Sequence, residues 1–187
     1  MARRSAATAS KVHLPTTAHS MNIQLVYLPQ AVLSTCREEA EKHYPFESGG
    51  TFMGYIQEDY AVVEALIPPG PKAERTRYGF APDHEWQLLE IARRYEQSGR
   101  RTTYLGDWHS HPNAGSGELS AKDRAVLRRI IRTEDARCSN PLMAILWGSS
   151  TSLWSLSVWS ACLARRTVIG RALSVHSVRC IAVKEAA

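Results

Sequence analysis

Two histidines flank a single serine where a strand-like segment ends, and an aspartate opens the helix-like segment that follows. The strand is expected over residues 103–109 and the helix over 120–133, with a loop rich in Gly, Pro and Ser between them. Residues two apart on a strand point to the same face, so His109 and His111 can turn both imidazoles toward one point. Asp123, in the first turn of the expected helix, can supply a third, anionic group at this strand-to-helix corner.

These three side chains suit a zinc ion. Imidazole nitrogen and carboxylate oxygen bind Zn²⁺ at about 2.0–2.2 Å, and three protein ligands leave one tetrahedral position open for water, as in catalytic sites. Simpler interpretations exist: the histidines could be hydrogen-bonded side chains, and Ser120 with Asp123 could form a capping box. Three candidate ligands at one corner favour one zinc ion per chain, held by His109, His111 and Asp123.

The rest of the pattern predicts an α/β fold, a layered mixed β-sheet flanked by helices. Further strands are expected at residues 22–28, 51–56, 61–67, 142–147 and 153–159, and further helices at 31–43 and 83–97. A short polar link makes the strands at 51–56 and 61–67 a hairpin. The helix at 83–97 is expected to place Leu88, Ile91, Ala92 and Tyr95 on one face. Residues 68–82, with four prolines, are expected to be a loop.

Both ends of the chain are basic. Residues 1–21 are expected to be a disordered leader or a mis-assigned start, residues 22–163 the folded domain, and residues 164–187 a basic C-terminal tail. Basic tails are usually only solvated, so nucleic-acid binding is not expected. No segment approaches the roughly 18 apolar residues of a membrane span. The 4 cysteines are widely spaced, which indicates reduced thiols in a cytoplasm.

The motif resembles that of the JAMM (MPN-plus, JAB) zinc metalloproteases. Over roughly residues 22–160, the chain matches the family's distant glutamate, its two histidines and its Ser-x-x-Asp with Glu47, His109-Ser110-His111-Pro112 and Ser120-Ala121-Lys122-Asp123. The loop before Ser120 is one residue longer than the usual pattern, which makes Ser116 an alternative serine. Ser120 is preferred because it keeps the spacing, and one extra loop residue costs little. The Ser110 side chain is expected to point away from the metal.

The resemblance implies a JAMM/MPN (cytidine-deaminase-like) architecture and hydrolysis of an amide or isopeptide bond. In this family the glutamate, here Glu47, is the general base, and the serine, here Ser120, stabilises the oxyanion. The implied substrates are the C-terminal tail of a ubiquitin-like protein or a conjugated nucleotidyltransferase, as in bacterial cyclic-oligonucleotide anti-phage (CBASS) operons. Contacts with such a tail are expected from residues 68–82.

Three other functions stay open at this point. The first is a peptidase that trims the tail of a small sulfur-carrier protein. The second is a non-catalytic MPN scaffold, which is disfavoured because scaffold members lack the ligands and all of them are present here. The third is a nucleic-acid-binding accessory protein, which rests only on the basic ends of the chain.

Overall fold

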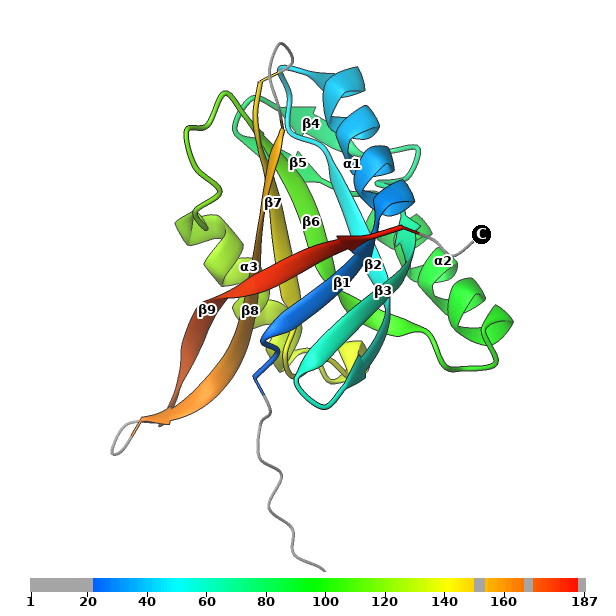
Figure 1. The fold of residues 1–187 in the computed structure, drawn as a ribbon, viewed down its shortest axis with the longest axis vertical. Coiled ribbons are helices and arrows are strands. Elements are labelled where there is room, and N and C mark those ends of the chain that lie inside the picture. Colours follow the sequence, from blue (N-terminus) through cyan, green and yellow to red (C-terminus); the bar gives the residue numbers. More distant parts are fainter. Residues whose placement is uncertain (1–21, 150–153, 167–169, 185–187) are drawn as a thin grey trace, which may run out of the picture.

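Seven strands form one mixed sheet that closes on itself. The computed structural model describes residues 22–149, 154–166 and 170–184, so the expected leader lies outside the described residues. The strand order is β1-β3-β2-β6-β7-β8-β9, and β9 also pairs with β1 (Figure 1). The strands are β1 (Leu25–Pro29), β2 (Gly49–Gln57), β3 (Tyr60–Ile67), β6 (Thr103–Pro112), β7 (Leu142–Gly148), β8 (Ser155–Arg166) and β9 (Gly170–Val183). The expected mixed α/β class is confirmed.

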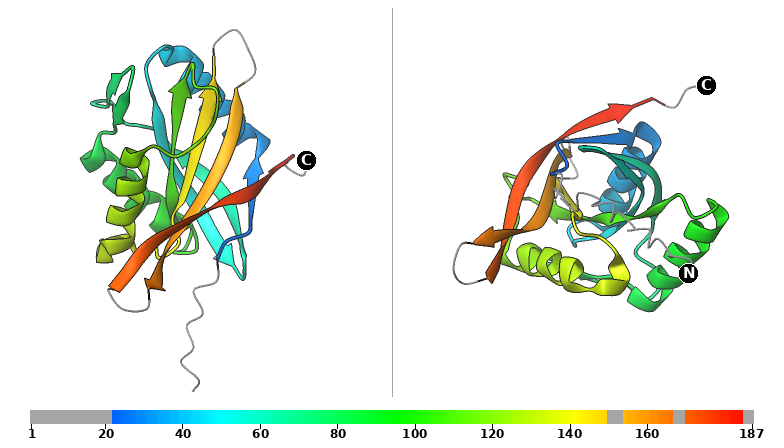
Figure 2. Two further views of the ribbon diagram at one scale, coloured as in Figure 1. Left: turned by 90° about the vertical axis from the view of Figure 1, so that its left-hand side faces the viewer. Right: turned by 90° about the horizontal axis from the view of Figure 1, so that it is seen from below.

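The helices lie on opposite faces of this sheet. Helix α1 (Gln30–His43) lies on one side, and α2 (His84–Gln97) and α3 (Ala121–Arg132) lie on the other (Figure 2). Alternate residues of β7 face the two cores: Ala144 and its i±2 neighbours pack with buried residues of α1, whereas Ile145 packs with Leu127 of α3. A strand buried on both faces needs a continuous apolar run, which explains the sequence of β7.

The segment 68–82 is not a plain loop. It contains a small two-stranded hairpin, β4 (Glu74–Thr76) and β5 (Gly79–Ala81), separate from the main sheet. The turn residues Arg77 and Tyr78 lie at its tip, and Tyr78 is 88% exposed. The expectation of a loop is therefore wrong for residues 74–81, where two three-residue strands form around a tight turn.

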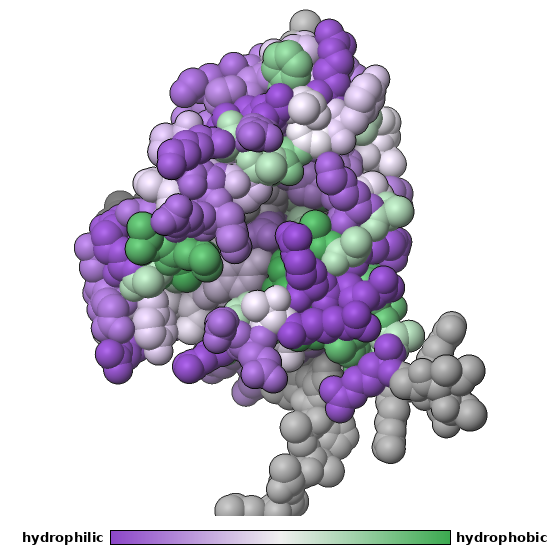
Figure 3. Space-filling model, turned by 180° about the vertical axis from the view of Figure 1, so that it is seen from behind, coloured by the Kyte–Doolittle hydropathy of each residue, from purple (hydrophilic) through white to green (hydrophobic). Residues whose placement is uncertain are grey.

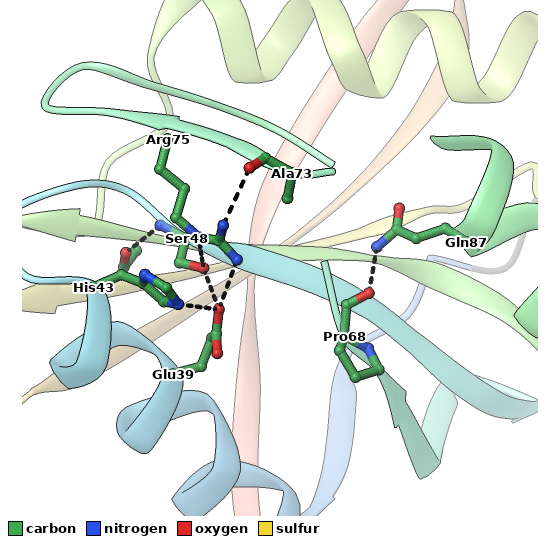
Figure 4. Close-up of polar contacts among 8 residues, drawn as sticks. Glu39, His43, Ser48, Pro68, Ala73, Arg75 and Gln87 are labelled. Carbon is green, nitrogen blue, oxygen red and sulfur yellow. Dashed lines mark hydrogen bonds and ion pairs between the residues drawn. The ribbon is translucent and has the colours of Figure 1, made fainter. Parts of the chain in front are cut away.

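The predicted face of α2 is also corrected. Leu88 is 52% exposed, whereas the neighbouring Gln87 is buried. The Gln87 side chain donates a hydrogen bond to the backbone oxygen of Pro68 at 3.0 Å (Figure 4). Of the four residues predicted to share one face, Leu88 and Ala92 are exposed, whereas Ile91 and Tyr95 are half-buried, so that face is only partly covered.

The C-terminal segment is part of the sheet, so the expected basic tail over 164–187 is wrong for β9. This strand pairs antiparallel with β8 and parallel with β1, with Leu25 opposite Arg179. Val178 is buried in the main core, while the arginines at 171 and 179 are exposed. The alternation of apolar and polar residues makes a strand here, and the basic composition had obscured it.

Within the described residues, none of the helices combines the length and the apolar character that crossing a bilayer requires.

Candidate metal centre

Strand β6 brings His109 and His111 together. It lies between β2 and β7, where His109 is paired with Gly49 on one side and Ile145 on the other. The two histidines project from the same face, and their Nε2 atoms are 2.9 Å apart. Both side chains are largely shielded from solvent, at 12% and 17% exposure. The strand geometry that the sequence predicts is therefore present.

Asp123 reaches the same point from the first turn of α3. Its Oδ1 lies 3.1 Å from His109 Nε2, and its Oδ2 lies 3.8 Å from His111 Nε2. The capping box is present as well: the Ser120 N–H donates to Asp123 Oδ2 at 2.7 Å, and Ser120 Oγ accepts from the Asp123 N–H at 3.2 Å. Capping and ligand presentation are therefore not alternatives here, because the cap aims the carboxylate at the histidines.

The three donor groups fit a small divalent cation. All the candidate ligand atoms lie within 4.8 Å of one another. Ligands bound tetrahedrally to zinc at about 2.05 Å lie about 3.3 Å from each other. The closest separations, 2.9, 3.1 and 3.8 Å, scatter around that value. Two nitrogens and one carboxylate oxygen also form a donor set that zinc accepts.

The protonation of the ligands favours metal binding. Burial lowers the pKa of His111, the His109 charge lowers it further, and Asp123 opposes both. Burial raises the pKa of Asp123, but hydrogen bonds with His109 and Ser120 and the charge of His109 outweigh it and lower the pKa to about 2. A neutral imidazole and an ionised carboxylate are the forms that bind a metal ion.

Glu47 lies in a pocket with these residues. The pocket has a volume of about 690 Å³, and its lining includes Glu47, His111, Ser120 and Asp123. Burial raises the pKa of Glu47, the His109 charge lowers it, Asp123 raises it and Lys122 lowers it. These electrostatic effects place Glu47 within the field of the histidine–aspartate cluster, although 62 residues separate it from His109 in the sequence.

Backbone contacts hold the Glu47 segment against β6. The adjacent Ser48 N–H donates to Ser110 Oγ at 3.0 Å, and the Ser110 N–H donates to the Ser48 carbonyl at 2.7 Å. Ser110 is fully buried and turned away from the histidines, as expected. A Cβ on Gly49 would lie 2.3 Å from the Trp108 carbonyl, so only glycine allows this approach of β2 to β6.

A partly buried polar cluster ties the β4–β5 hairpin to the same segment (Figure 4). Ser48 Oγ donates to Glu39 Oε1 at 2.6 Å, and Arg75 donates from Nε to Ser48 Oγ at 3.0 Å and from Nη2 to Glu39 Oε1 at 3.1 Å. The Glu47 N–H donates to the Thr76 carbonyl at 2.8 Å. Side-chain bonds thus link helix α1, the hairpin and Ser48, and a backbone bond links the hairpin to Glu47.

The longer loop between His111 and Ser120 is anchored at both ends. The Asn113 N–H donates to the Gly148 carbonyl at 2.6 Å, and its Oδ1 accepts from Tyr44 at 2.7 Å. Trp159 Nε1 donates to the Gly117 carbonyl at 2.8 Å. Ser116 is exposed and is not among the residues that line the pocket, whereas Ser120 is. The position of Ser120 supports its preference over Ser116.

Sequence reasoning missed several residues around this site. Lys122 and Arg77 line the pocket, and Lys122 Nζ would lie 2.7 Å from a Cβ on Gly79 of the hairpin. Lys122 stands inside the Ser-x-x-Asp motif, so its position could have drawn attention. Nothing in the pattern marks Arg75 or Glu39, because their pairing depends on a hairpin that the sequence did not predict.

A profile of the prokaryotic homologues of the JAB domain (Prok-JAB) matches residues 29–159. The chain belongs to this family. A probable metalloprotease, y4qB, of Sinorhizobium fredii is 44% identical over 147 residues, which cover 78% of this chain and 89% of that protein. The family and this relative together define the class of protein as a metalloprotease-type hydrolase.

Two further relatives carry a more specific name. A CD-NTase/cGAS isopeptidase of Enterobacter hormaechei is 33% identical over 115 residues, 59% of this chain and 61% of that protein. A second CD-NTase/cGAS isopeptidase, of Escherichia coli, is 28% identical over 88 residues, 46% of this chain and 56% of that protein. The solution structure of protein DSY2949 of Desulfitobacterium hafniense has a TM-score of 0.61 at 19% identity and covers 86% of this chain and 94% of that one. This last likeness supports the fold.

Proposed function

We propose that this protein is a zinc-dependent isopeptidase with one metal ion per chain. The convergence of His109, His111 and Asp123, with ligand atoms within 4.8 Å of one another beside Glu47, is the observation that carries the proposal. The names of the relatives, a metalloprotease and two isopeptidases, agree with this chemistry. A scaffold has no need for the paired histidines and the aspartate.

Glu47 and Ser120 are the groups that we assign to catalysis. A zinc ion held by His109, His111 and Asp123 would supply Lewis-acid chemistry and would lower the pKa of a bound water toward about 7. Glu47 takes a proton from the attacking water and passes it to the leaving amine as the C–N bond breaks. A carboxylate with a raised pKa is suited to this transfer.

Ser120 can keep its capping role and act on the substrate. Its Oγ accepts a hydrogen bond from the Asp123 N–H, which leaves the hydroxyl proton free to donate. In the reaction this proton is directed at the oxyanion that forms on the substrate carbonyl. Donors of this kind lower the barrier by about 3–4 kcal/mol.

The substrate in this proposal is a protein with an extended C-terminal tail joined through an isopeptide or peptide bond. The pocket is open to solvent beside the hairpin tip, where Arg77 and Tyr78 line it together with Pro112 and Asn113. On this ground we assign the tail contacts to the segment 68–82, which includes Arg77 and Tyr78. The tail is that of a ubiquitin-like protein or of a conjugated nucleotidyltransferase, as the names of the isopeptidase relatives suggest.

We place the reaction in bacterial anti-phage defence in the cytoplasm, where it reverses conjugation of the nucleotidyltransferase. The support is the likeness to the two CD-NTase/cGAS isopeptidases, over 115 and 88 residues respectively. The test is incubation of the purified protein with a conjugated nucleotidyltransferase and with a ubiquitin-like fusion. Release of the free proteins is followed by gel electrophoresis and mass spectrometry.

Two matched controls make this test decisive. A chelator is expected to stop cleavage, and added zinc to restore it. The variant E47A is expected to bind zinc normally and to lose cleavage by about 10²-fold or more. Cleavage by E47A at the normal rate would remove Glu47 from its assigned role, and cleavage that survives complete metal removal would refute the proposed chemistry.

A further inference from the structure

The solvent-facing side of α3 is basic along its whole length. Seven residues of this helix are exposed; two are alanines and the other five are Lys122, Arg124, Arg128, Arg129 and Arg132. The helix has one acidic residue, Asp123, which is 6% exposed and turned toward the histidines. No exposed position of α3 therefore carries a negative charge.

The other helices differ in this respect. Helix α2 balances its arginines with nearby acids, as in the pair Arg93–Glu90 at 2.6 Å. Arg100, just beyond that helix, pairs with Glu96 at 3.1 Å. Among the described residues, no ion pair involves an arginine of α3.

The arrangement on α3 is unfavourable for the helix by itself. Arg124, Arg128 and Arg132 follow one another at i, i+4 spacing, where like charges repel. Lys122 and Arg124 also lie in the first turn, near the positive end of the helix dipole. Arg129 and Arg132 suit the negative end of the dipole in the last turn, but local helix stability does not explain Lys122, Arg124 and Arg128.

The positive charge is concentrated on this helix. Outside α3 and residues 1–20, the chain has fifteen basic and seventeen acidic residues, whereas α3 has five basic residues and one acidic residue. A domain that is otherwise slightly negative presents one cationic strip. Figure 3 views the molecule from behind, the side that α2 and α3 cover, and shows strongly hydrophilic side chains over much of this face.

The strip begins at the pocket. The four residues from Ser120 to Asp123 line it, and α3 then runs away from it for twelve residues, about 18 Å. A protein whose tail occupies the pocket has its folded body over the neighbouring surface. We propose that the α3 strip, defined as Arg124, Arg128 and Arg132 with Lys122 and Arg129, docks an acidic face of the protein substrate.

An acidic protein fits this surface better than a nucleic acid. Proteins that bind single strands combine basic grooves with aromatic rings on which bases stack, and α3 exposes no aromatic residue. The net negative charge of the remaining domain opposes the long polyanion of a duplex. Complementary charge between proteins mainly speeds association and selects partners, which suits an enzyme that must release its product.

The inference rests on the proposed function for the identity of the partner, and the experiment separates the two. The triple variant R124E/R128E/R132E leaves every pocket residue in place. The matched control, R37E/K42E/R93E, makes the same change in net charge on α1 and α2. Circular dichroism and zinc content of both variants are measured first, to establish that each is folded.

The first readout is cleavage. With a protein conjugate as substrate at about 0.15 M salt, the α3 variant is expected to raise KM by roughly tenfold with kcat unchanged. A short peptide that spans only the scissile bond is expected to be cleaved equally by all three proteins. An α3 variant with the same KM as the control variant overturns the docking surface.

The second readout does not need catalysis. Fluorescence anisotropy of a labelled poly-glutamate peptide and of random-sequence duplex DNA is measured with the intact protein and both variants. The proposal is supported if the intact protein and the control variant bind poly-glutamate and the α3 variant does not. This result would stand even if no tested conjugate were cleaved and the proposed function had failed. Binding of DNA without poly-glutamate reassigns the strip to nucleic acid, and binding of neither probe overturns it.

Discussion

The hydroxyl of Ser110 accepts a hydrogen bond from the backbone N–H of Ser48 at 3.0 Å, with both residues fully buried. Ser110 stands between the two histidines, and Ser48 directly follows Glu47. Together with the bond from the Ser110 N–H to the Ser48 carbonyl, this contact holds the segment that carries the proposed general base against the strand that carries two proposed ligands. The serine between the histidines acts as a positioning residue, although its side chain points away from the cluster.

The variant S110A is expected to keep its zinc and lose activity. Without the hydroxyl, the Ser48 N–H is buried with one acceptor fewer, which costs about 1–3 kcal/mol of folding stability. Loss of this bond is expected to displace Glu47, which lowers kcat and has little effect on the zinc content. Kinetics measure kcat, and elemental analysis measures the zinc content. S116A, on the exposed loop, is the control and should behave like the unaltered protein. A fully active S110A would show that Glu47 is positioned by other contacts.

Asp123 is expected to reveal two separable roles. Both D123A and D123N should lose zinc, from about one ion per chain to almost none, because the anionic ligand is gone. Only D123N retains an oxygen that can accept from the Ser120 N–H. The metal-free D123A should therefore unfold about 1 kcal/mol more easily than the metal-free D123N, measured by urea denaturation. Equal stability of the two variants would mean that the cap contributes nothing.

Lys122 is expected to influence the pH at which cleavage is lost on the acidic side of the profile. Burial raises the pKa of Glu47 and the Lys122 charge lowers it, with opposing effects from His109 and Asp123. The general base works as the carboxylate, so activity falls as the pH drops through this pKa. Replacing Lys122 by Met removes a charge that stabilises the carboxylate. The acidic limb of the profile of kcat/KM against pH should consequently move to higher pH in K122M.

K42M is the matched control for that measurement. It removes one positive charge from an exposed position of α1 that does not line the pocket. Its acidic limb should coincide with that of the unaltered protein. A K122M profile that does not move, or that moves to lower pH, would contradict the electrostatic link between Lys122 and Glu47.

Local patterns predicted that His109, His111 and Asp123 converge, because all three residues lie on regular elements. The alternation of His109 and His111 on a strand and the Ser120–Asp123 spacing at a helix start are set by backbone geometry alone. The positions of the central strands followed from their apolar runs in the same way. Only the resemblance, however, related Glu47 to the cluster, because the register of β2 against β6 is a long-range property.

Three features could not be read from local pattern. Strand β9 was hidden by its arginines, since the pairing of residue 179 with Leu25 spans almost the whole chain. On α2 the polar Gln87 is buried and donates to the Pro68 carbonyl, whereas Leu88 is exposed. The β4–β5 hairpin is held by side chains from α1 and from the start of β2. In each case tertiary contacts override a local preference.

The cluster of Glu39, Ser48 and Arg75 is expected to hold the β4–β5 hairpin against α1. Arg75 donates to both partners, and its side chain is 18% exposed while that of Glu39 is 19% exposed. R75A leaves the partly buried Glu39 carboxylate with only His43 and Ser48 as partners, so it should destabilise the fold by about 1–3 kcal/mol. Because the hairpin then loses its link to α1, proteolysis within residues 74–81 should become faster.

A double-mutant cycle with E39Q isolates the pair. The two side chains share hydrogen bonds with Ser48, so their effects should be non-additive by about 0.5–3 kcal/mol in urea unfolding. The same cycle in kcat/KM, with the protein conjugate as substrate, tests whether the hairpin contributes to the pocket. If the two substitutions prove additive in both measurements, Arg75 and Glu39 act independently and the hairpin is held in place by its backbone contacts with Glu47 alone.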